Sequence, residues 1–336
     1  MKIIVDAMGG DNAPREAILG AIQARERFGV EIILAGRSED ILASMQSLNI
    51  PTLPSGISIT YASQVIGMDE SPVAAFKEKP DSSMNVALKL LAAGEADAMV
   101  SAGSTGALLT GAIFTAKRIP GIKRAALAAF LPTAKGQTLL LDCGANVDCS
   151  PDYLLQFGVM GSYYAAKVLG IEKPKVGLLN IGTEESKGSA LYKDAYALMK
   201  QAGESGAFHF AGNVEGRDVP LGAVDVAVAD GFAGNVLLKT YEGAGVFFSS
   251  LLKGLFTKNI FTKLAAVTMK GGIREFKKTV DYEEVGGAPL LGIAAPIIKA
   301  HGSSKAKSFY NAIRQAKLYA EGDIVGLIAR QIGKEE

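Results

Sequence analysis

The feature that most constrains the fold of this chain is a series of short, β-branched apolar runs, each followed by a cluster of Gly, Ser, Asn or Asp. The runs are continuous rather than alternating, which is typical of strands buried on both faces of a parallel sheet. Segments with helical spacing separate many of them, so the pattern predicts an α/β fold with a mostly parallel sheet. The nine runs cover residues 3–6, 32–36, 57–62, 98–102, 126–131, 138–142, 176–182, 208–213 and 224–230.

Length and charge exclude several classes of protein. The 336 residues are 49% hydrophobic and carry a net charge of +1, which argues against disorder and against a dedicated nucleic-acid binder. No low-complexity linker divides the chain, so we expect one large domain over 1–336. Cys143 and Cys149 do not form a metal motif and the two histidines are isolated, so we expect neither metal nor cofactor. The start of the chain does not resemble a signal peptide, which predicts a cytoplasmic protein.

Polar, glycine-rich loops follow six of the runs and hold the candidate functional residues. Ligands of parallel α/β sheets bind beyond the carboxyl ends of the strands. Glycines allow close approach, and amides at the following helix starts favour an anion. We therefore expect the six loops to meet at one edge of the sheet around an anionic, oxygen-rich group. They cover residues 6–12, 101–106, 142–146, 180–188, 212–217 and 230–235.

Individual loops leave alternatives open. The loop 101–106 leads into a predicted helix over 107–117 and is either a phosphate cradle or an ordinary tight turn with a Ser cap. Lys187 precedes Gly188, the wrong order for an ATP-binding loop, but it could still meet an anion as a point charge.

The sequence predicts different surroundings for the two histidines. His301 precedes a predicted helix over 306–319 and should be neutral there, beside a second anion site or as a surface cap. His209, within an apolar run, is expected in the core.

One segment, 244–280, is both apolar and cationic. Its seven cations and one acid give a local charge of +6, which leaves the remainder of the chain mildly acidic. A break at Lys258-Asn259 predicts two helices. A basic amphipathic hairpin is typical of a membrane surface or an acidic partner, whereas the alternative is a core or a dimer interface. The expected contact residues are Phe247, Phe248, Leu251, Lys253, Leu255, Phe256 and Lys258.

Taken together, the loops resemble those of the PlsX-type phosphate acyltransferases over nearly the whole chain. The motifs that carry the resemblance are DAMGGDNAP (6–14), SAGSTGAL (101–108), DCGANVDCSP (142–151), NIGTEESKG (180–188), DGFAGNVLLKTYEG (230–243) and GGAPLLGIAAPIIKAHGSSK (286–305). The resemblance implies a doubly wound sheet similar to those of isocitrate and isopropylmalate dehydrogenases and of phosphotransacetylase. It also implies a homodimer that makes acyl phosphate from acyl-(acyl carrier protein) and inorganic phosphate for phospholipid synthesis, with a downstream membrane acyltransferase as a further partner.

In that reaction phosphate itself attacks the thioester, so no protein nucleophile is needed. We expect the phosphate to be held by Gly103, Ser104, Thr105, Asn146 and Lys305. Lys187, Asn180 and Asn235 would polarise the carbonyl, and His301 would aid phosphate or the leaving sulfur. Phosphotransacetylases have a Ser-Arg-Gly where this chain resembles them with Ala300-His301-Gly302, so His301 and Lys305 are the expected substitutes for the phosphate-binding arginine. Covalent catalysis by Cys143 is the rival mechanism.

Three other functions remain as alternatives. They are a phosphotransacetylase that uses acyl-CoA, a metal- and nicotinamide-dependent dehydrogenase suggested by fold alone, and a non-catalytic membrane scaffold.

Overall fold

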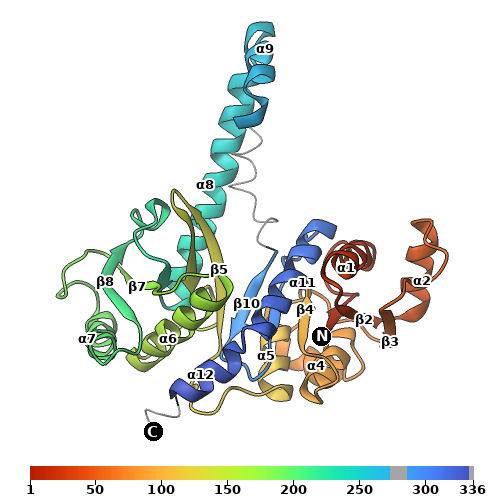
Figure 1. The fold of residues 1–336 in the computed structure, drawn as a ribbon, viewed down its shortest axis with the longest axis horizontal. Coiled ribbons are helices and arrows are strands. Elements are labelled where there is room, and N and C mark those ends of the chain that lie inside the picture. Colours follow the sequence, from red (N-terminus) through yellow and green to blue (C-terminus); the bar gives the residue numbers. More distant parts are fainter. Residues whose placement is uncertain (273–285, 333–336) are drawn as a thin grey trace.

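A single eleven-stranded sheet runs through the molecule (Figure 1). The computed structural model describes residues 1–272 and 286–332. The strand order is β3-β2-β1-β4-β11-β10-β5-β6-β9-β7-β8. The strands are β1 Lys2–Asp6, β2 Glu31–Gly36, β3 Ile57–Tyr61, β4 Ala98–Ser101, β5 Ala126–Thr133, β6 Gly136–Leu141, β7 Lys175–Asn180, β8 His209–Glu215, β9 Val226–Val228, β10 Ala288–Leu291 and β11 Ile297–Lys299.

Helices cover both faces of the sheet, as a doubly wound fold requires. They are α1 Arg15–Phe28, α2 Ser38–Ser47, α3 Pro72–Glu78, α4 Ser83–Ala92, α5 Thr105–Thr115, α6 Pro151–Val168, α7 Ala190–Glu204, α8 Gly231–Thr257, α9 Ile260–Thr268, α11 Ala306–Glu321 and α12 Ile324–Ile332, with a short 3-10 helix at Val219–Leu221. The predicted α/β fold with a mostly parallel sheet is confirmed. Each of the nine apolar runs contains a strand, whereas β10 and β11 were not predicted.

The sheet consists of two parallel groups of strands joined by antiparallel pairs. Strands β3, β2, β1, β4 and β11 are parallel to one another, and so are β6, β9, β7 and β8. Between the groups, β10 pairs antiparallel with β11 and β5, and β5 pairs antiparallel with β6. The second group therefore runs opposite to the first. The expectation that all six loops share one edge is wrong, because the strand direction reverses at the centre of the sheet.

Alternate residues of each strand enter separate cores. Ile3 and Val5 of β1, and Leu139 and Leu141 of β6, pack in one core that continues across both strand groups. On the opposite face, Ile4 joins a core beneath α4 and α5. A third core around β6, β7 and β9 lies beneath the start of α8. The second face is thus covered by two separate helical layers, and the site lies where these layers meet.

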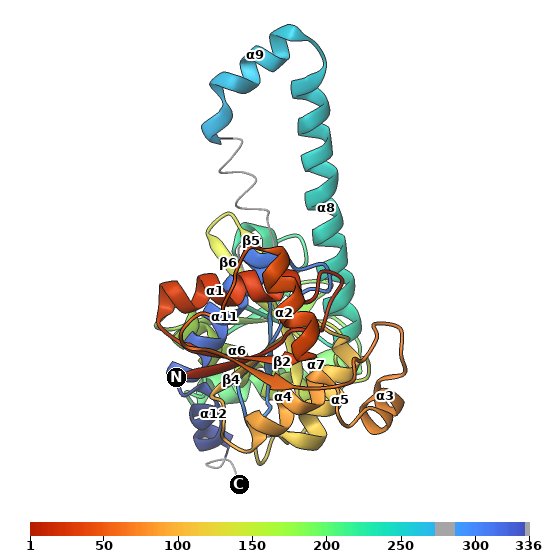
Figure 2. The ribbon, with the colours of Figure 1, turned by 90° about the vertical axis from the view of Figure 1, so that its right-hand side faces the viewer.

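Helix α8 extends far beyond the sheet, and α9 folds back beside it (Figures 1 and 2). The helices break at the predicted Lys258-Asn259, where the side chain of Asn259 accepts the N–H of Thr262 at the start of α9. Residues 273–280 of the predicted hairpin lie outside the described residues. No helix in the part of the chain that the structure describes is long and apolar enough to cross a membrane.

The prediction of a buried His209 is wrong. Its neighbour Phe208 is buried, but His209 is exposed at the first position of β8. Strand β8 is the last strand of the sheet, so its outer side has no neighbouring strand.

Candidate functional site

A small pocket lies where the two strand groups meet. It is lined from α5, β5, β10, β11 and the loop after β6, by Thr105, Leu108, Leu109, Leu127, Ala145, Leu290 and Lys299. The lining is mainly leucine, and Lys299 is its charged member. The pocket brings together two of the predicted loops, 101–106 and 142–146, although their strands run in opposite directions.

The start of α5 forms one wall of this pocket. Ser104 is the buried N-cap residue, makes no capping hydrogen bond with its side chain, and is followed by the exposed Thr105. The first N–H groups of a helix have no partner inside the helix, and its N-terminus favours an anion. Gly103 contributes differently from the prediction, because its N–H donates to Ser101 Oγ at 3.1 Å. A Cβ there would lie 2.7 Å from Met84 Cε, so the end of the Met84 side chain would have to move to admit one.

The loop after β6 is held by Asp142. Its buried carboxylate accepts the backbone N–H groups of Leu127 (2.9 Å), Ala145 (3.3 Å) and Asn146 (2.7 Å). Burial raises the pKa of Asp142, and these hydrogen bonds oppose the rise. The Asn146 side-chain amide donates to Ala125 O at 2.8 Å and to Asp142 at 3.1 Å. Asn146, a predicted phosphate ligand, therefore spends its amide donors on fixing the loop that carries Ala145.

The loop after β11 carries His301 and Lys305. The N–H of Ser303 donates to His301 Nδ1 at 3.2 Å, which leaves Nε2 to carry the proton of the neutral ring. Burial and the nearby cations Lys299 and Lys239 lower the pKa of His301, so the predicted neutral imidazole agrees with its surroundings. Because Lys239 belongs to α8, this loop faces α8.

The second predicted anion site, at the start of α11, is already occupied by a carboxylate of the protein itself. The N–H of Ala306 donates to Glu16 Oε2 at 2.8 Å, and the N–H of Ser304 donates to His301 O. Glu16 comes from α1, 290 residues earlier in the chain. Lys305 is exposed beside this carboxylate, so the structure does not bring it to the α5 pocket.

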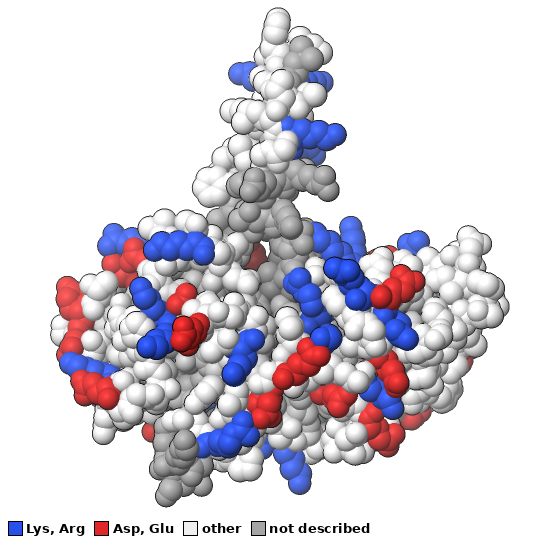
Figure 3. Space-filling view, viewed as in Figure 1, with Lys and Arg blue, Asp and Glu red and all other residues white. Residues whose placement is uncertain are grey.

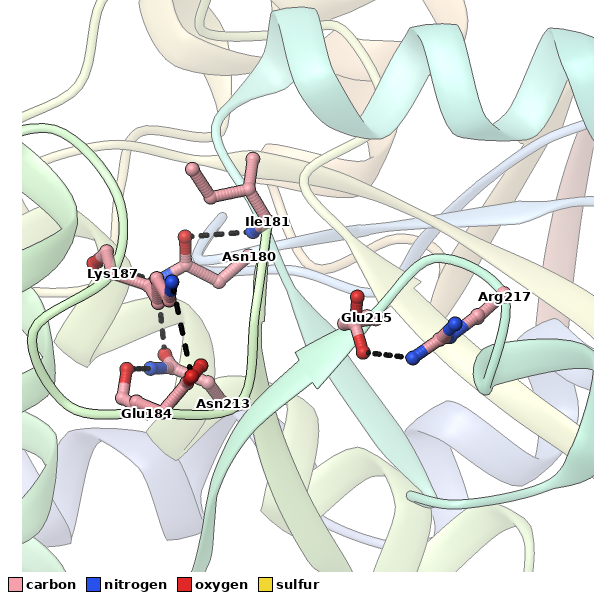
Figure 4. A network of polar contacts seen from close by, with 7 residues as sticks. All are labelled: Asn180, Ile181, Glu184, Lys187, Asn213, Glu215 and Arg217. Carbon is pink, nitrogen blue, oxygen red and sulfur yellow. Dashed lines mark hydrogen bonds and ion pairs between the residues drawn. The ribbon is translucent and has the colours of Figure 1, made fainter.

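Asn180 and Lys187 belong to a polar network at the ends of β7 and β8 (Figure 4). Asn180 Nδ2 donates to Asn213 Oδ1 at 3.1 Å and to Lys187 O at 3.2 Å. Lys187 Nζ lies 3.8 Å from the Glu184 carboxylate and is half exposed. Among the described residues, these hydrogen bonds and this ion pair stay within the network and do not reach the α5 pocket.

Asn235 occupies the exposed side of α8 near its start. Its Nδ2 would lie 3.1 Å from a Cβ on Gly144, which follows Asp142 in the loop after β6. Asp230 is the N-cap residue of helix α8. Its side chain accepts the N–H of Ala233 at 2.8 Å and, through Oδ2, the hydroxyl of Tyr192 at 2.6 Å. Asn235 is therefore held beside the loop that forms the second wall of the pocket.

Sequence reasoning missed a row of polar side chains across three adjacent strands. Asp6 and Lys299 are both in register with Ser101, from the two sides of β4, so the three side chains share the α5 face of the sheet. Ser101 donates to Asp6 Oδ2 at 2.7 Å, and all three residues are buried. The motif DAMGG contains Asp6, but no spacing in the sequence shows that it aligns with Lys299.

Cys143 is poorly placed for the rival covalent mechanism. It is 4% exposed, and its thiol lies 3.2 Å from Leu140 O. Burial raises the pKa of the Cys143 thiol well above its ordinary value, which suppresses the reactive thiolate.

Comparison with known proteins agrees with the fold and shows the family. A phosphotransacetylase from Streptococcus pyogenes matches with a TM-score of 0.64 at 20% identity, over 96% of this chain and 94% of that one, so the class of fold is the α/β fold of phosphotransacetylases. The model of the family described as "Fatty acid synthesis protein" matches residues 1–325. The phosphate acyltransferase of Thermoanaerobacter pseudethanolicus is 49% identical over 99% of this chain and 97% of its own length. That of Brevibacillus brevis is 47% identical over 99% and 98%.

The chain therefore belongs to this family of fatty acid synthesis proteins, the PlsX-type phosphate acyltransferases, and is a transferase. The predicted resemblance is confirmed.

Proposed function

We propose that this enzyme transfers a long-chain acyl group from acyl carrier protein to inorganic phosphate, giving acyl phosphate for phospholipid synthesis. The observation that carries the proposal is the start of α5, where the N–H groups favour an anion and which lies beside the leucine-lined α5 pocket. A phosphate and the apolar chain next to a thioester need these two surroundings side by side. Membership of the family supports the same reaction.

In the proposed step, a phosphate oxygen attacks the thioester carbonyl, the new C–O bond forms and the C–S bond breaks. Hydrogen phosphate loses its proton and the carrier thiol gains one, so no oxidant or protein nucleophile is required. The amides at the start of α5, with Ser104 and Thr105, hold phosphate, and the Nε2–H of His301 donates to the leaving sulfur. Asn235 is assigned to the carbonyl from the α8 side. Asn180 and Lys187 would join it by leaving the contacts that hold them at the ends of β7 and β8.

The experiment is to measure thiol release from long-chain acyl carrier protein with and without inorganic phosphate. We expect release that depends on phosphate and is faster than with the matching acyl-CoA. A preference for acyl-CoA would instead support a phosphotransacetylase. Absence of phosphate-dependent release from either thioester would contradict the proposal and favour a scaffold.

We further propose that the α8–α9 hairpin attaches the enzyme, as a cytoplasmic homodimer, to the membrane surface where a downstream acyltransferase uses the product. Large apolar side chains are exposed on more than one side of α8 and on α9, including Phe247 (59%), Leu255 (60%) and Phe261 (78%). From residue 244 to 272 the hairpin carries four lysines and no acid, and Figure 3 shows these cations on its mainly uncharged surface. Apolar side chains with basic neighbours suit an anionic lipid surface.

A further inference from the structure

Lys299 occupies a position where the sheet otherwise places apolar side chains. It ends β11 after Ile297 and Ile298, which are fully buried, and is itself 7% exposed. A lysine is almost never so deeply buried unless its charge is paired. The position therefore needs an explanation that packing alone does not supply.

The charge of Lys299 is not neutralised by a contacting carboxylate. Its Nζ donates to Ala102 O at 3.4 Å and to Ala300 O, and within residues 1–272 and 286–332 no ion pair joins it to an acid. Asp6 lies two strands away in the same row, but its carboxylate accepts the Ser101 hydroxyl and the Met8 N–H. An ammonium group has three N–H donors, so two carbonyl partners leave one donor.

Lys299 lies close to the start of α5. It lines the α5 pocket together with Thr105, the first residue of α5. Its Nζ donates to Ala102 O, two residues before the N-cap Ser104, so the buried ammonium lies near the helix N-terminus, and both favour an anion.

We infer that Lys299 is the cation that binds the phosphate substrate at the start of α5, beside the α5 pocket. The inference deepens the proposed function and rests on it for the identity of the anion. Phosphate would supply the negative charge that Lys299 lacks, and the ammonium would hold it against the first amides of α5. Asp6 acts on the other end of the row: its bond to Ser101 fixes the hydroxyl that accepts the Gly103 N–H and so positions the turn into α5.

The pH dependence of phosphate binding follows from the same groups. Burial lowers the pKa of Lys299 to about 8, while Asp6 and Asp11 oppose this by favouring the charged form. His301 lies near enough to respond to Lys299, and Lys239 and Glu242 of α8 face His301 in turn. Above pH about 8 the unliganded enzyme loses the ammonium, so the KM for phosphate should rise there.

The test uses the full-length enzyme and inorganic phosphate. Lys299→Met, which keeps the length of the side chain without its charge, should raise the KM for phosphate about 10- to 100-fold, the loss expected for one charge-assisted hydrogen bond. It should also abolish the rise in Tm that phosphate gives the wild type. Lys299→Gln, which can still donate to Ala102 O, should behave in the same way. The matched control is Lys135→Met, an exposed lysine in the turn between β5 and β6.

The outcomes separate this inference from the proposed function. A wild-type KM for phosphate in both Lys299 variants, with active wild-type enzyme, would overturn the inference and leave the function standing. If the wild type shows no phosphate-dependent thiol release, the function fails, and the phosphate-induced rise in Tm still tests Lys299. A variant that does not fold is replaced by the wild type measured from pH 7 to 9. A KM that follows only the ionisation of phosphate would then contradict the role of Lys299.

Discussion

At the scale of single residues, the site depends on polar groups whose environments change their chemistry. Lys299, Asp6 and Asp142 are all buried, and each is held by hydrogen bonds to uncharged groups rather than by a contacting partner of opposite charge. Burying a charged group costs free energy that its hydrogen bonds only partly offset, so such positions are explained best by a role in binding a ligand or fixing a loop. We therefore interpret the row of Asp6, Ser101 and Lys299 as a functional feature rather than as part of the packed core.

Lys299→Met should make the unliganded protein more stable. Burial lowers the pKa of Lys299 to about 8, so at pH 7 the folded state holds a charge that it disfavours. Removing that charge should raise the free energy of unfolding by about 1–3 kcal/mol at pH 7, with less gain as pH rises and the wild-type lysine loses its proton. Urea titrations at pH 7 and pH 9.5 measure this. Destabilisation at pH 7 would mean that Lys299 mainly holds the two carbonyl groups.

Gly9→Ala should disturb the row of Asp6, Ser101 and Lys299. A Cβ at this position would lie 2.6 Å from Asp6 Oδ2 and 2.7 Å from the Gly103 backbone nitrogen. Neither atom can move without disturbing the turn into α5, so we expect a loss of about 1–3 kcal/mol in stability and a higher KM for phosphate. Gly94→Ala, at a glycine with open space around it but a φ of 75°, controls for backbone strain alone. Equal phosphate kinetics in the two variants would refute the close-approach argument.

His301→Ala and Lys187→Ala test the assignment of the transfer step. Loss of the donor to the leaving sulfur should lower kcat about 100-fold in His301→Ala. Because the pKa of His301 is lowered, the neutral ring should persist through pH 7, and the wild-type kcat should fall only on the acid side of the ordinary histidine pKa. Near-normal turnover in both variants would remove these residues from the mechanism.

At the scale of elements, the α8–α9 hairpin is set apart from the rest of the fold. The first turns of α8 belong to a core through Ala233, Leu237 and Tyr241. Beyond residue 244 its apolar side chains are largely exposed, and Phe256 is only half-buried. The first turns of α8 thus hold Asn235 beside the site. The rest of the helix extends away from the sheet (Figure 2).

Replacement of Phe247, Phe248 and Leu251 by serine should lower binding to vesicles of phosphatidylglycerol at least about tenfold, because three exposed apolar side chains no longer enter the lipid. Cosedimentation measures the effect, and Leu42→Ser, an exposed leucine on α2, is the matched control. Unchanged cosedimentation would refute membrane attachment. A shift from dimer to monomer, with unchanged vesicle binding, would assign the hairpin to the dimer interface instead.

At the scale of the whole molecule, the sequence predicts the elements better than their arrangement. The long β-branched runs identified nine strands, because burial on both faces leaves a continuous apolar signature. Strands β10 and β11 are short and contain Pro289 and Lys299, so they lack this signature. Because β10 is antiparallel to both β11 and β5, these two strands run in the same direction, and the net reversal between the strand groups comes at the antiparallel pair of β5 and β6. The prediction of a single edge of loops was wrong because it treated β5 and β6 as parallel strands.

The residues of the candidate site also differ in how well the sequence predicts them. Ser104 and Thr105 could be placed from a strand followed by a helix, which is local information. Lys299 could not, because its burial and its alignment with Asp6 arise from two long-range strand pairings, one of Asp6 with Ser101 and one of Ser101 with Lys299. Likewise, no local pattern predicts that Glu16 of α1 contacts the start of α11.

The most direct test of the central claim is the stoichiometry of the products. Purified enzyme, long-chain acyl-(acyl carrier protein) and inorganic phosphate are incubated, and free thiol, acyl phosphate and fatty acid are measured in the same sample. The account predicts one acyl phosphate for each thiol released, with no release when phosphate is omitted. Equal thiol release without phosphate, with fatty acid as the product, would show that water accepts the acyl group and would contradict the account.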